Sequence, residues 1–501
     1  MSPARPVHVS PGAAHLAPEV LRLLDTWLPR QRWYPVPAED VTHEPWLTVT
    51  FGGVADVVVA LLRLAGPGLA TGDEALVIHV PLVLTPTAEP EADTTDTEAA
   101  GLIGTVTTAS GTATVHDGGV HPVAWHAYFT AALPSACEPE DCAELAGARR
   151  ISGEQSNTSV VLPALPHAGG GPGRGGMLKI LRTVALGPHP DVVIPAALTR
   201  AGWDGVPRFL GAVPLPAPPG AGVSGTTTPG TAPDPAPGST VSTSGSVPAG
   251  ADPAPFAHLA VLSELVHDAT DGFELACAYA ARDEDFGERA AELGGVVAHL
   301  HSTLRDALGP GPVLEPAGFL GVLRRRAAEA FADVPDLAPQ RAGVTALYDA
   351  VKARLAAVGE HAGSLVRLQS IHGDLHLGQA LHSPDGWKIL DFEGEPQRPV
   401  AERTAPDLPL RDVAGMLRSL DYAGAVGQAT DPHWVSHAQL AFLEGYRQAT
   451  GTPDALDVAT AELLLRALTV DKALYEVVYE FRHRPAWMHI PLTAVERVLG
   501  S

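Results

Sequence analysis

Two polar motifs in the C-terminal half of the chain have the spacing of a phosphoryl-transfer site. The motif HGDLHLGQ contains His372, Asp374 and, five positions later, Gln379, and the apolar run KIL then leads to Asp391 in the motif DFEGEP. Kinase catalytic loops read H-x-D-x-x-x-x-N and are followed by a metal-binding Asp on the next hairpin. Phosphoryl transfer needs a carboxylate beside the attacking hydroxyl and oxygen ligands for Mg²⁺. The spacing therefore predicts Asp374 as the catalytic base and three magnesium ligands: Gln379, Asp391 and Glu393.

A nucleotide site needs further groups, and the candidates lie earlier in the chain. Lys179 in the strand-like run MLKIL is predicted to reach the α- and β-phosphates of ATP. The backbone groups of Glu264 and Val266 in LSELV, which precedes the helical part of the chain, are predicted to bind adenine. A polar turn before the lysine strand would offer backbone N–H groups and hydroxyls to the phosphates. Its residues are Gln155, Ser156, Asn157 and Thr158.

These assignments have alternatives. A turn rich in Ser, Asn and Thr is usually only a hairpin, and Lys179 could lie at a strand edge with its charge in water. The alternating His372, Asp374 and His376 could bind a transition metal, which would make the protein a metallohydrolase. A catalytically inactive binding protein with the same fold is a third class of function.

The elements that would carry these residues form three regions. Residues 1–143 contain one amphipathic helical pattern, LAPEVLRLLDTWLPR, and Val- and Thr-rich runs typical of a strand meander. Residues 144–270 continue with strands around one helix, and residues 271–501 show helical periodicity interrupted by the catalytic motifs. A β-rich N-terminal cap, a β-rich lobe and a helical lobe predict an α+β fold, bilobal and protein-kinase-like.

A segment rich in Pro, Gly, Ser and Thr over residues 214–254 interrupts the strand pattern. It contains too few apolar residues to form a core and is predicted to be disordered. Strand-like sequence resumes directly after it with AHLAVLSELV. The segment is therefore interpreted as a long insertion in a surface hairpin and not as a linker between domains.

Composition narrows the partners. The net charge of −24 leaves no basic face for nucleic acid or an anionic membrane, although a small anionic ligand needs only a local Lys or Arg cluster. Three cysteines, Cys137, Cys142 and Cys277, give neither a disulfide framework nor a zinc pair. The N-terminus shows no signal-like apolar run, and other apolar runs are too short to span a bilayer. A cytoplasmic monomer that binds small molecules is expected.

Taken together, the motifs resemble a known family. HGDLHLGQ, DFEGEP, PLRDVAGMLRSLDYA and LYEVVYEFRHRPAWMHIPL look like actinobacterial maltokinase, an aminoglycoside phosphotransferase-like kinase with an N-terminal cap. EQSNTSVV, LKILR and ATDGFELA are similar too, and the resemblance is strongest over residues 365–495. It implies transfer of phosphate from ATP, with Mg²⁺, to the C1 hydroxyl of maltose. The product would be maltose 1-phosphate for glycogen and α-glucan synthesis.

The sugar acceptor is assigned to the last of these motifs. Two tyrosines four residues apart would share a helix face, which is usual for core residues but also suits stacking on sugar rings. Carboxylate and guanidinium groups beside them could bond sugar hydroxyls. With the histidine of the catalytic loop, the predicted acceptor residues are His372, Tyr475, Tyr479, Glu480, Arg482 and Trp487.

The sequence departs from the family at three places. RWYPVPAED stands where the family tends to have RWYAGKG, and Val193 stands where a Glu is expected to pair with the strand lysine. The segment 214–254 is additional. The phosphoryl-transfer motifs are intact, whereas the acceptor is less constrained. Glucosamine kinase, a related family that shares the cap and the lobes, is therefore the alternative.

Overall fold

The contacts within the chain divide it into two compact units. The β-rich unit comprises Met1–His189 and Leu210–Ser263, and the helical unit comprises Pro190–Phe209 and Glu264–Ser501. The further division of the β-rich unit into a cap and a lobe stays a prediction. The computed structural model describes residues 6–36, 40–71, 75–86, 101–108, 111–133, 145, 147–151, 156–163, 165, 175–218, 256–359, 366–395, 403, 405–450 and 457–500.

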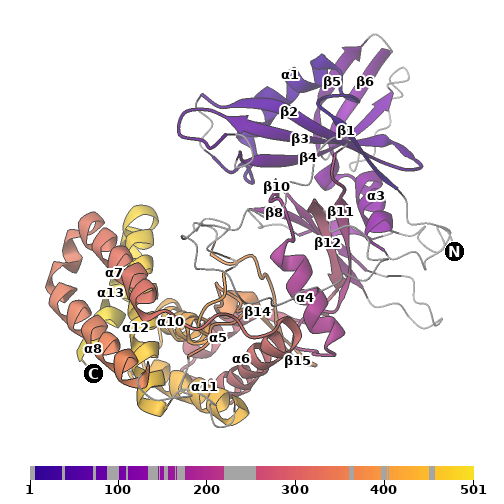
Figure 1. Ribbon diagram of the computed structural model, residues 1–501. Helices are drawn as coiled ribbons and strands as arrows, with labels where there is room; N and C mark the ends of the chain where they lie inside the picture. Colours follow the sequence, from indigo (N-terminus) through magenta and orange to yellow (C-terminus); the bar gives the residue numbers. More distant parts are fainter. Residues whose placement is uncertain are drawn as a thin grey trace, which may run out of the picture. The chain divides into compact units, whose positions relative to one another are not determined.

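The N-terminal strands form the predicted antiparallel meander (Figure 1). The strand order is β1-β2-β3-β4-β6-β5, and β10, which follows the lysine strand, pairs with β4. The strands are β1 (Val7–Pro11), β2 (Thr42–Phe51), β3 (Val54–Ala65), β4 (Val77–Pro86), β5 (Leu102–Thr108), β6 (Gly111–Asp117) and β10 (Thr183–Val184).

Strand β3 reads as a continuous apolar run because both faces of this sheet are covered. Successive side chains on a strand point to opposite faces. Val58, Ala60 and Leu62 pack with residues of α1 (Pro18–Trp27), whereas Val57, Val59 and Leu61 share a core with α3 (Pro122–Ala132) and the second sheet. Figure 1 shows α1 lying against the sheet. Two short 3₁₀ turns, η1 (Leu28–Arg30) and η3 (Gly118–Val120), complete this part.

The second sheet of the β-rich unit carries the predicted nucleotide lysine. Its order is β11-β12-β9-β8-β7, with Lys179 in β9. Because β11 and β12 are neighbours, the Pro/Gly-rich segment lies between two paired strands, as predicted. Its first two residues, Pro214 and Leu215, belong to β11, so the disorder predicted from residue 214 is wrong there; residues 219–254 lie outside the described ones. The strands are β7 (Arg149–Arg150), β8 (Asn157–Leu162), β9 (Gly176–Leu181), β11 (Phe209–Leu215) and β12 (Ala257–Glu264).

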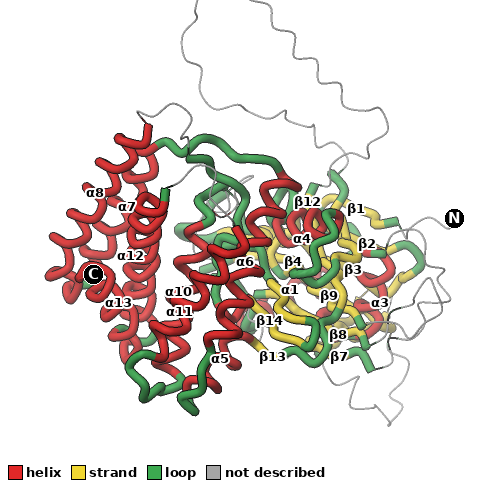
Figure 2. Tube along the Cα trace, turned by 90° about the horizontal axis from the view of Figure 1, so that it is seen from below, coloured by secondary structure: helices red, strands yellow, loops and turns green. Residues whose placement is uncertain are grey.

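The helical unit has two apolar cores, which its helices enclose. Figure 2 shows the helices packed side by side, with α10 beside α11 and α12 beside α7. Among the described residues, no helix has the length and apolar character that a bilayer crossing needs. The helices are α4 (Pro190–Arg200), α5 (Gly272–Ala280), α6 (Gly287–Leu308), α7 (Pro316–Asp333), α8 (Arg341–Gly359), α10 (Leu410–Val426), α11 (Trp434–Thr450), α12 (Val458–His483) and α13 (His489–Gly500), with 3₁₀ turns η4 (Pro335–Gln340), η5 (Leu377–Gln379) and η6 (Pro485–Trp487).

A small antiparallel sheet interrupts these helices and carries the predicted catalytic motifs. It consists of β13 (Thr270–Asp271), β14 (Ala380–Ser383) and β15 (Gly386–Ile389). The turn between β14 and β15 reads Ser-Pro-Asp-Gly, and Gly386 has a φ of 90°, a conformation that favours glycine. The hairpin therefore places Asp374 and Gln379 before its first strand and Asp391 after its second.

Candidate functional site

The catalytic loop is held by one buried carboxylate. Asp412, in the first turn of α10, accepts the backbone N–H of His372 at 2.8 Å and that of Gly373 at 2.9 Å. Gly373 has a φ of 87°, so the loop turns sharply just before Asp374. The main chain of the loop is thereby fixed from a helix that begins almost forty residues later.

Asp412 is itself anchored by a pair of side chains from two other helices. The ring Nε2–H of His301 donates to its carboxylate at 3.0 Å, and the other ring nitrogen of His301 lies 2.9 Å from the hydroxyl of Tyr446. Burial alone would raise the pKa of Asp412, but the hydrogen bond from His301, the nearby histidines and the loop N–H groups outweigh it. The pKa of Asp412 therefore lies below its ordinary value, and the buried group stays ionised.

His372 braces the loop from within. Its Nε2 lies 2.7 Å from the carbonyl oxygen of Leu390 and its Nδ1 lies 3.3 Å from the backbone N of Asp374. A carbonyl can only accept, so the Nε2 of His372 donates to Leu390. The side chain is buried against Phe392. Both nitrogens thus contact the loop, and the role of His372 as an acceptor-sugar residue stays a prediction.

Asp374 meets a cation that the sequence motifs did not reveal. The Nζ of Lys472, on α12, lies 3.0 Å from a carboxylate oxygen of Asp374 and 2.5 Å from one of Glu395. Burial would raise the pKa of Asp374, but Lys472 together with His376 and His372 lowers it below its ordinary value. Lys472 lies 98 positions from Asp374. Its place in the motif-rich run DKALYEVVYE was the only signal available in the sequence.

The predicted magnesium ligands gather with a third carboxylate that was missed. Ligand atoms of Asp191, Asp391 and Glu393 lie within 4.8 Å of one another. Asp391 has a φ of 59°, which few residues other than Gly, Asn and Asp adopt. The amide of Gln379 lies 3.4 Å from the Asp391 carboxylate. An all-oxygen donor set of this kind fits Mg²⁺.

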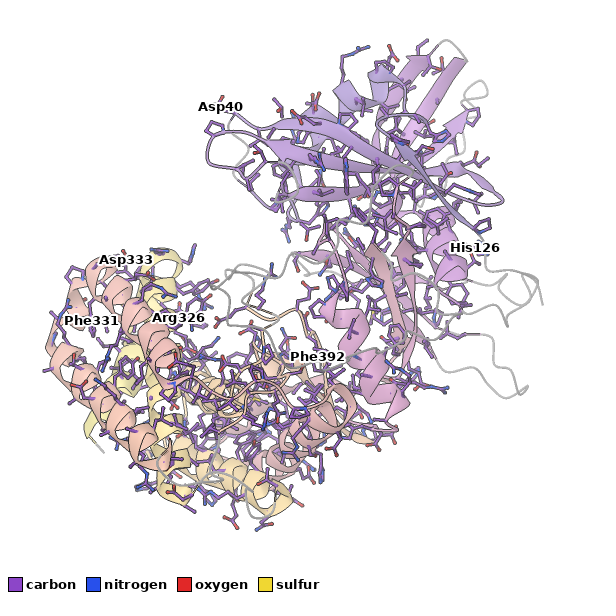
Figure 3. The ribbon with its side chains drawn as sticks, viewed as in Figure 1. Asp40, His126, Arg326, Phe331, Asp333 and Phe392 are labelled. Carbon is purple, nitrogen blue, oxygen red and sulfur yellow. The ribbon has the colours of Figure 1, made fainter. Side chains whose placement is uncertain are left out.

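Asp191 reaches this hairpin from α4. Its carboxylate accepts the backbone N–H of Phe392, labelled in Figure 3, at 2.6 Å. Asp191 follows Pro190 in the first helical turn, where an acidic residue is common, so the sequence offered only a helix-start signal. Val193, two residues after Asp191 in α4, is exposed and has no carboxylate that could pair with a lysine. Asp191 is thus the acidic residue of α4 that reaches a predicted catalytic segment.

The metallohydrolase alternative needs His372 and His376 as metal ligands, but both rings already make hydrogen bonds in the loop. Both nitrogens of His372 serve the loop, and the Nδ1 of His376 accepts the N–H of Gly378 at 3.1 Å. Within the described ranges, the one group of three that could hold a metal ion is the carboxylate set and contains no histidine. Burial, stronger than the opposing charge of Asp374, lowers the pKa of His376, so its ring favours the neutral form.

Five of the six predicted acceptor residues lie along the end of α12 and the turn after it. Glu480 is buried, accepts the hydroxyl of Tyr422 at 3.0 Å and pairs with Arg484 at 2.6 Å. The guanidinium of Arg484 lies 4.5 Å from the ring centre of Trp487 and 5.4 Å from that of Tyr479. Tyr479, Glu480 and Trp487 are therefore brought together, while Tyr475 lies one turn earlier with its ring centre 5.2 Å from the Nζ of Lys472.

Arg482 is also in α12, but its side chain makes a different contact. It forms an exposed ion pair at 2.6 Å with Asp333, which Figure 3 labels on α7. An exposed ion pair of this kind contributes little to stability. Its guanidinium points to α7, on another side of α12 from Glu480. Arg482 thus pairs with α7 in this structure, and its role in binding the acceptor stays a prediction.

A row of charged residues runs along α12 at four-residue spacing. It consists of Lys472, Glu476 and Glu480, which a helix places on one face. Glu476 bonds the Nε of Arg418 at 2.8 Å, and the fully buried Arg418 also pairs with Asp421. Burial, against the opposing charges of Arg418 and Lys472, raises the pKa of Glu476. The row thus extends from Asp374 to the aromatic residues near Arg484.

In the β-rich unit, the predicted phosphate turn has a different environment. Gln155 lies outside the described residues, and Ser156 precedes β8. Asn157 and Thr158 are buried in β8, where Asn157 accepts the backbone N–H of Arg182 at 3.2 Å and Thr158 accepts its Nε–H at 2.9 Å. Their side chains therefore bind the chain's own arginine, and a phosphate contact of Thr158 stays a prediction.

Arg182 explains this arrangement. It is almost fully buried, pairs with Asp117 at 3.2 Å and lies 4.5 Å from the ring centre of Trp33. Trp33 belongs to the RWY run, so the first sheet and the lysine strand are joined here. Lys179 lies opposite Ser159 in the strand register. Sequence reasoning passed over Arg182 because a single Arg after a strand carries no pattern.

The predicted adenine contacts lie at the end of β12. The backbone N–H of Glu264 donates to the carbonyl of Arg208 at 2.8 Å, so this donor is already used. Val266 is half-buried, and its role stays a prediction. The nucleotide groups Lys179, Glu264 and Val266 thus remain candidates, with the N–H of Glu264 removed from the set.

Comparisons with known proteins agree with this picture. The family model of the maltokinase N-terminal cap domain matches residues 27–120. A glucosamine kinase of Streptacidiphilus jiangxiensis is 32% identical over 220 residues, which are 40% of this chain and 47% of that protein. A glucosamine kinase of Mycolicibacterium smegmatis is 29% identical over 257 residues, 48% of this chain and 62% of that protein. The chain thus spans about half to three fifths of these relatives' length.

A solved structure is similar over most of the chain. The crystal form B structure of a glucosamine kinase covers 88% of this chain and 91% of its own, with a TM-score of 0.55 and 22% identity. This likeness confirms the predicted fold class, an α+β fold with a β-rich N-terminal region. The cap match and the relatives confirm the predicted resemblance to maltokinase-like kinases.

Proposed function

We propose that this chain is an ATP-dependent kinase that phosphorylates a hydroxyl of a sugar. The observation that carries the proposal is the catalytic loop: Asp412 fixes its main chain, and Asp374 at its tip is ionised beside Lys472. A base poised in this way can accept a proton from a bound hydroxyl. The names of both curated relatives support a kinase.

The reaction proceeds by in-line displacement. The acceptor oxygen attacks the γ-phosphorus of ATP, its proton passes to the carboxylate of Asp374, and the bond from the γ-phosphorus to the β,γ-bridging oxygen breaks to release ADP. The residues that would hold Mg²⁺ are Gln379, Asp391, Glu393 and the newly found Asp191. When bound, the ion supplies charge compensation for the phosphates. Lys179 is the proposed contact to the α- and β-phosphates.

Among sugars, we propose an amino sugar of the glucosamine class as the acceptor. A protonated amine needs a carboxylate within reach, and the row on α12 supplies the half-buried Glu476 and the buried Glu480 beyond the catalytic carboxylate. Both curated relatives are named glucosamine kinase, which supports the same choice. The proposal revises the maltose acceptor that the sequence resemblance implied.

Maltose remains the second candidate because of one observation. The family model that matches residues 27–120 describes a maltokinase cap. Tyr479 and Trp487, which meet around Arg484, would serve as stacking surfaces for a disaccharide. In that case the product is maltose 1-phosphate, as for a kinase that feeds α-glucan synthesis.

A coupled assay of ADP formation tests the proposal. The purified chain is supplied with Mg-ATP and, in turn, glucosamine, N-acetylglucosamine, glucose and maltose, with the Asp374→Asn variant as the blank. Glucosamine is expected to give the highest kcat/KM, and N-acetylglucosamine, which has no cationic amine, a far lower value. The order reverses in favour of maltose if the second candidate is right, and sugar-independent ADP formation throughout would reject a sugar kinase.

A further inference from the structure

The cation beside the catalytic base comes from outside the catalytic segment. Between Ser370 and Glu395 the sequence contains a single Lys or Arg, Lys388. The Nζ of Lys388 bonds the carbonyl oxygen of Asp204 at 2.5 Å and so is directed to the loop before β11. The loop motif therefore supplies no cation of its own to Asp374, and α12 supplies Lys472.

Lys472 joins two parts of the site that flank the hairpin. Asp374 precedes β14, and Glu395 follows the metal motif after β15; the Nζ of Lys472 lies within hydrogen-bond distance of both carboxylates. The Glu395 side chain is only 2% exposed, and those of Asp374 and Lys472 are each 18% exposed. A buried ammonium group with two carboxylate partners has few alternative positions, because leaving either charge unpaired is costly.

The position of Lys472 on its helix is also fixed. Its neighbours Asp471, Ala473 and Leu474 are buried, so α12 cannot rotate about its axis without exposing apolar side chains. One turn later Glu476 holds the buried Arg418 of α10, the same helix whose first turn carries Asp412. Two packed helices thus fix the loop. Asp412 of α10 bonds the main chain of the loop, and Lys472 of α12 bonds the side chain of Asp374.

We propose that Lys472 is a positioning residue for the catalytic carboxylate, with Glu395 as its second anchor, and that the pair orients Asp374 toward the acceptor hydroxyl. The inference rests on the proposed kinase function and adds to it a residue in α12 on which proton transfer depends. The titratable groups that face Asp374 are Lys472 from α12 and His372 and His376 from the loop, and of these Lys472 is the cation that bonds its carboxylate. Glu395 faces the same ammonium group from the segment after the hairpin.

The variants Lys472→Met, Lys472→Arg and Glu395→Gln test this role through the pH dependence of kcat/KM for the sugar. In Lys472→Met the largely enclosed Asp374 loses the cation that opposes the effect of burial, so the acid limb of the profile should move to higher pH by about 1–3 units. The pH-independent kcat/KM should fall by about 100-fold or more, within the range that a positioned base contributes. KM for ATP should not change.

Two further variants separate positioning from folding. Lys472→Arg keeps the charge and should restore an acid limb close to that of the wild type. Glu395→Gln removes the competing carboxylate, leaves the ammonium to Asp374 alone, and so should not move the limb to higher pH. Lys352→Met, an exposed lysine of α8, is the matched control and should behave as the wild type.

The outcomes are distinguishable. An acid limb of Lys472→Met that stays at the wild-type position, with lower kcat or lower thermal stability, would mean that Lys472 only supports the fold, and the proposal is overturned. If Lys472→Met does not fold, an upward shift of the limb in Glu395→Gln overturns it instead. A wild-type chain that shows no sugar-dependent turnover overturns the kinase proposal and this one together.

Discussion

The catalytic loop of the helical unit and the polar turn of the β-rich unit are similar polar motifs in the sequence, but their side chains have different surroundings in the structure. In the loop, the polar neighbours of Asp374 bond the main chain, so that the carboxylate of Asp374 itself is left at a partly exposed tip. In the turn, Asn157 and Thr158 are buried in β8 and bonded to Arg182. The first pattern builds a site, and the second joins two sheets.

The difference teaches what a short polar motif can and cannot predict. H-x-D contains a glycine with φ above zero and an aspartate placed by its neighbours, so much of its geometry is local. The direction of a Ser/Asn/Thr side chain depends instead on which partner arrives from elsewhere. Here Arg182 arrives with its guanidinium buried beside Asp117 and Trp33.

The largest expected effect is at the tip of the catalytic loop. Asp374→Asn removes the proton acceptor but keeps the side-chain shape, so kcat should fall by about 10²–10⁴-fold. Nucleotide affinity, measured by calorimetry, should stay as in the wild type because this carboxylate is proposed to contact the acceptor. Asp385→Asn, an exposed aspartate in the hairpin turn, is the matched control. A variant with near-normal kcat would show that the loop is not the site.

The second effect concerns the metal motif. Asp391→Asn should weaken binding of Mg-ATP by more than the 10- to 100-fold typical of residues that only support a ligand, at roughly unchanged stability. Asn tolerates the left-handed backbone of this position, so the fold should be kept. Titration calorimetry with and without Mg²⁺ checks this. Gln379→Ala should weaken the binding of Mg-ATP less than Asp391→Asn does. If Gln379→Ala weakened it more, the metal would lie on the other side of the hairpin.

The third effect concerns the group that holds the loop. Asp412→Asn weakens the hydrogen bonds to His372, Gly373 and His301, so the free energy of unfolding in urea should fall by about 1–3 kcal/mol. Since the pKa of Asp412 is depressed in the folded state, its contribution is present above the ordinary aspartate pKa and is lost as the pH falls through the folded-state value. The difference from wild type should therefore shrink toward low pH. A difference that does not depend on pH would contradict an ionised Asp412.

The smallest effect belongs to the turn of the β-rich unit. Thr158→Val removes the hydroxyl that accepts from Arg182 but keeps the side-chain volume, so stability should fall by about 1 kcal/mol. KM for ATP should be unchanged. Thr112→Val, at an exposed position of β6, is the control. A clear rise in KM for ATP in Thr158→Val would return the hydroxyl to the nucleotide site and remove the contrast with the catalytic loop.

Local and periodic features could be predicted from the sequence. The apolar run of β3, the meander, the insertion between β11 and β12 and the hairpin between Gln379 and Asp391 all follow from patterns within about twenty residues. The fold class followed from the order of these elements. The four-residue spacing of Tyr475 and Tyr479 likewise predicted a shared helix face, and both lie in α12.

The partners that hold and charge the site were decided by the tertiary structure. Asp191 precedes the Phe392 N–H that it binds by 201 positions, and Lys472 follows Asp374 by 98. No sequence spacing encodes such pairs, because they depend on which helix face packs against the hairpin. The same reason explains the surroundings of two predicted acceptor residues: both nitrogens of His372 contact its own loop, and Arg482 pairs with α7. The sequence determined which residues could do chemistry, and packing decided which of them meet.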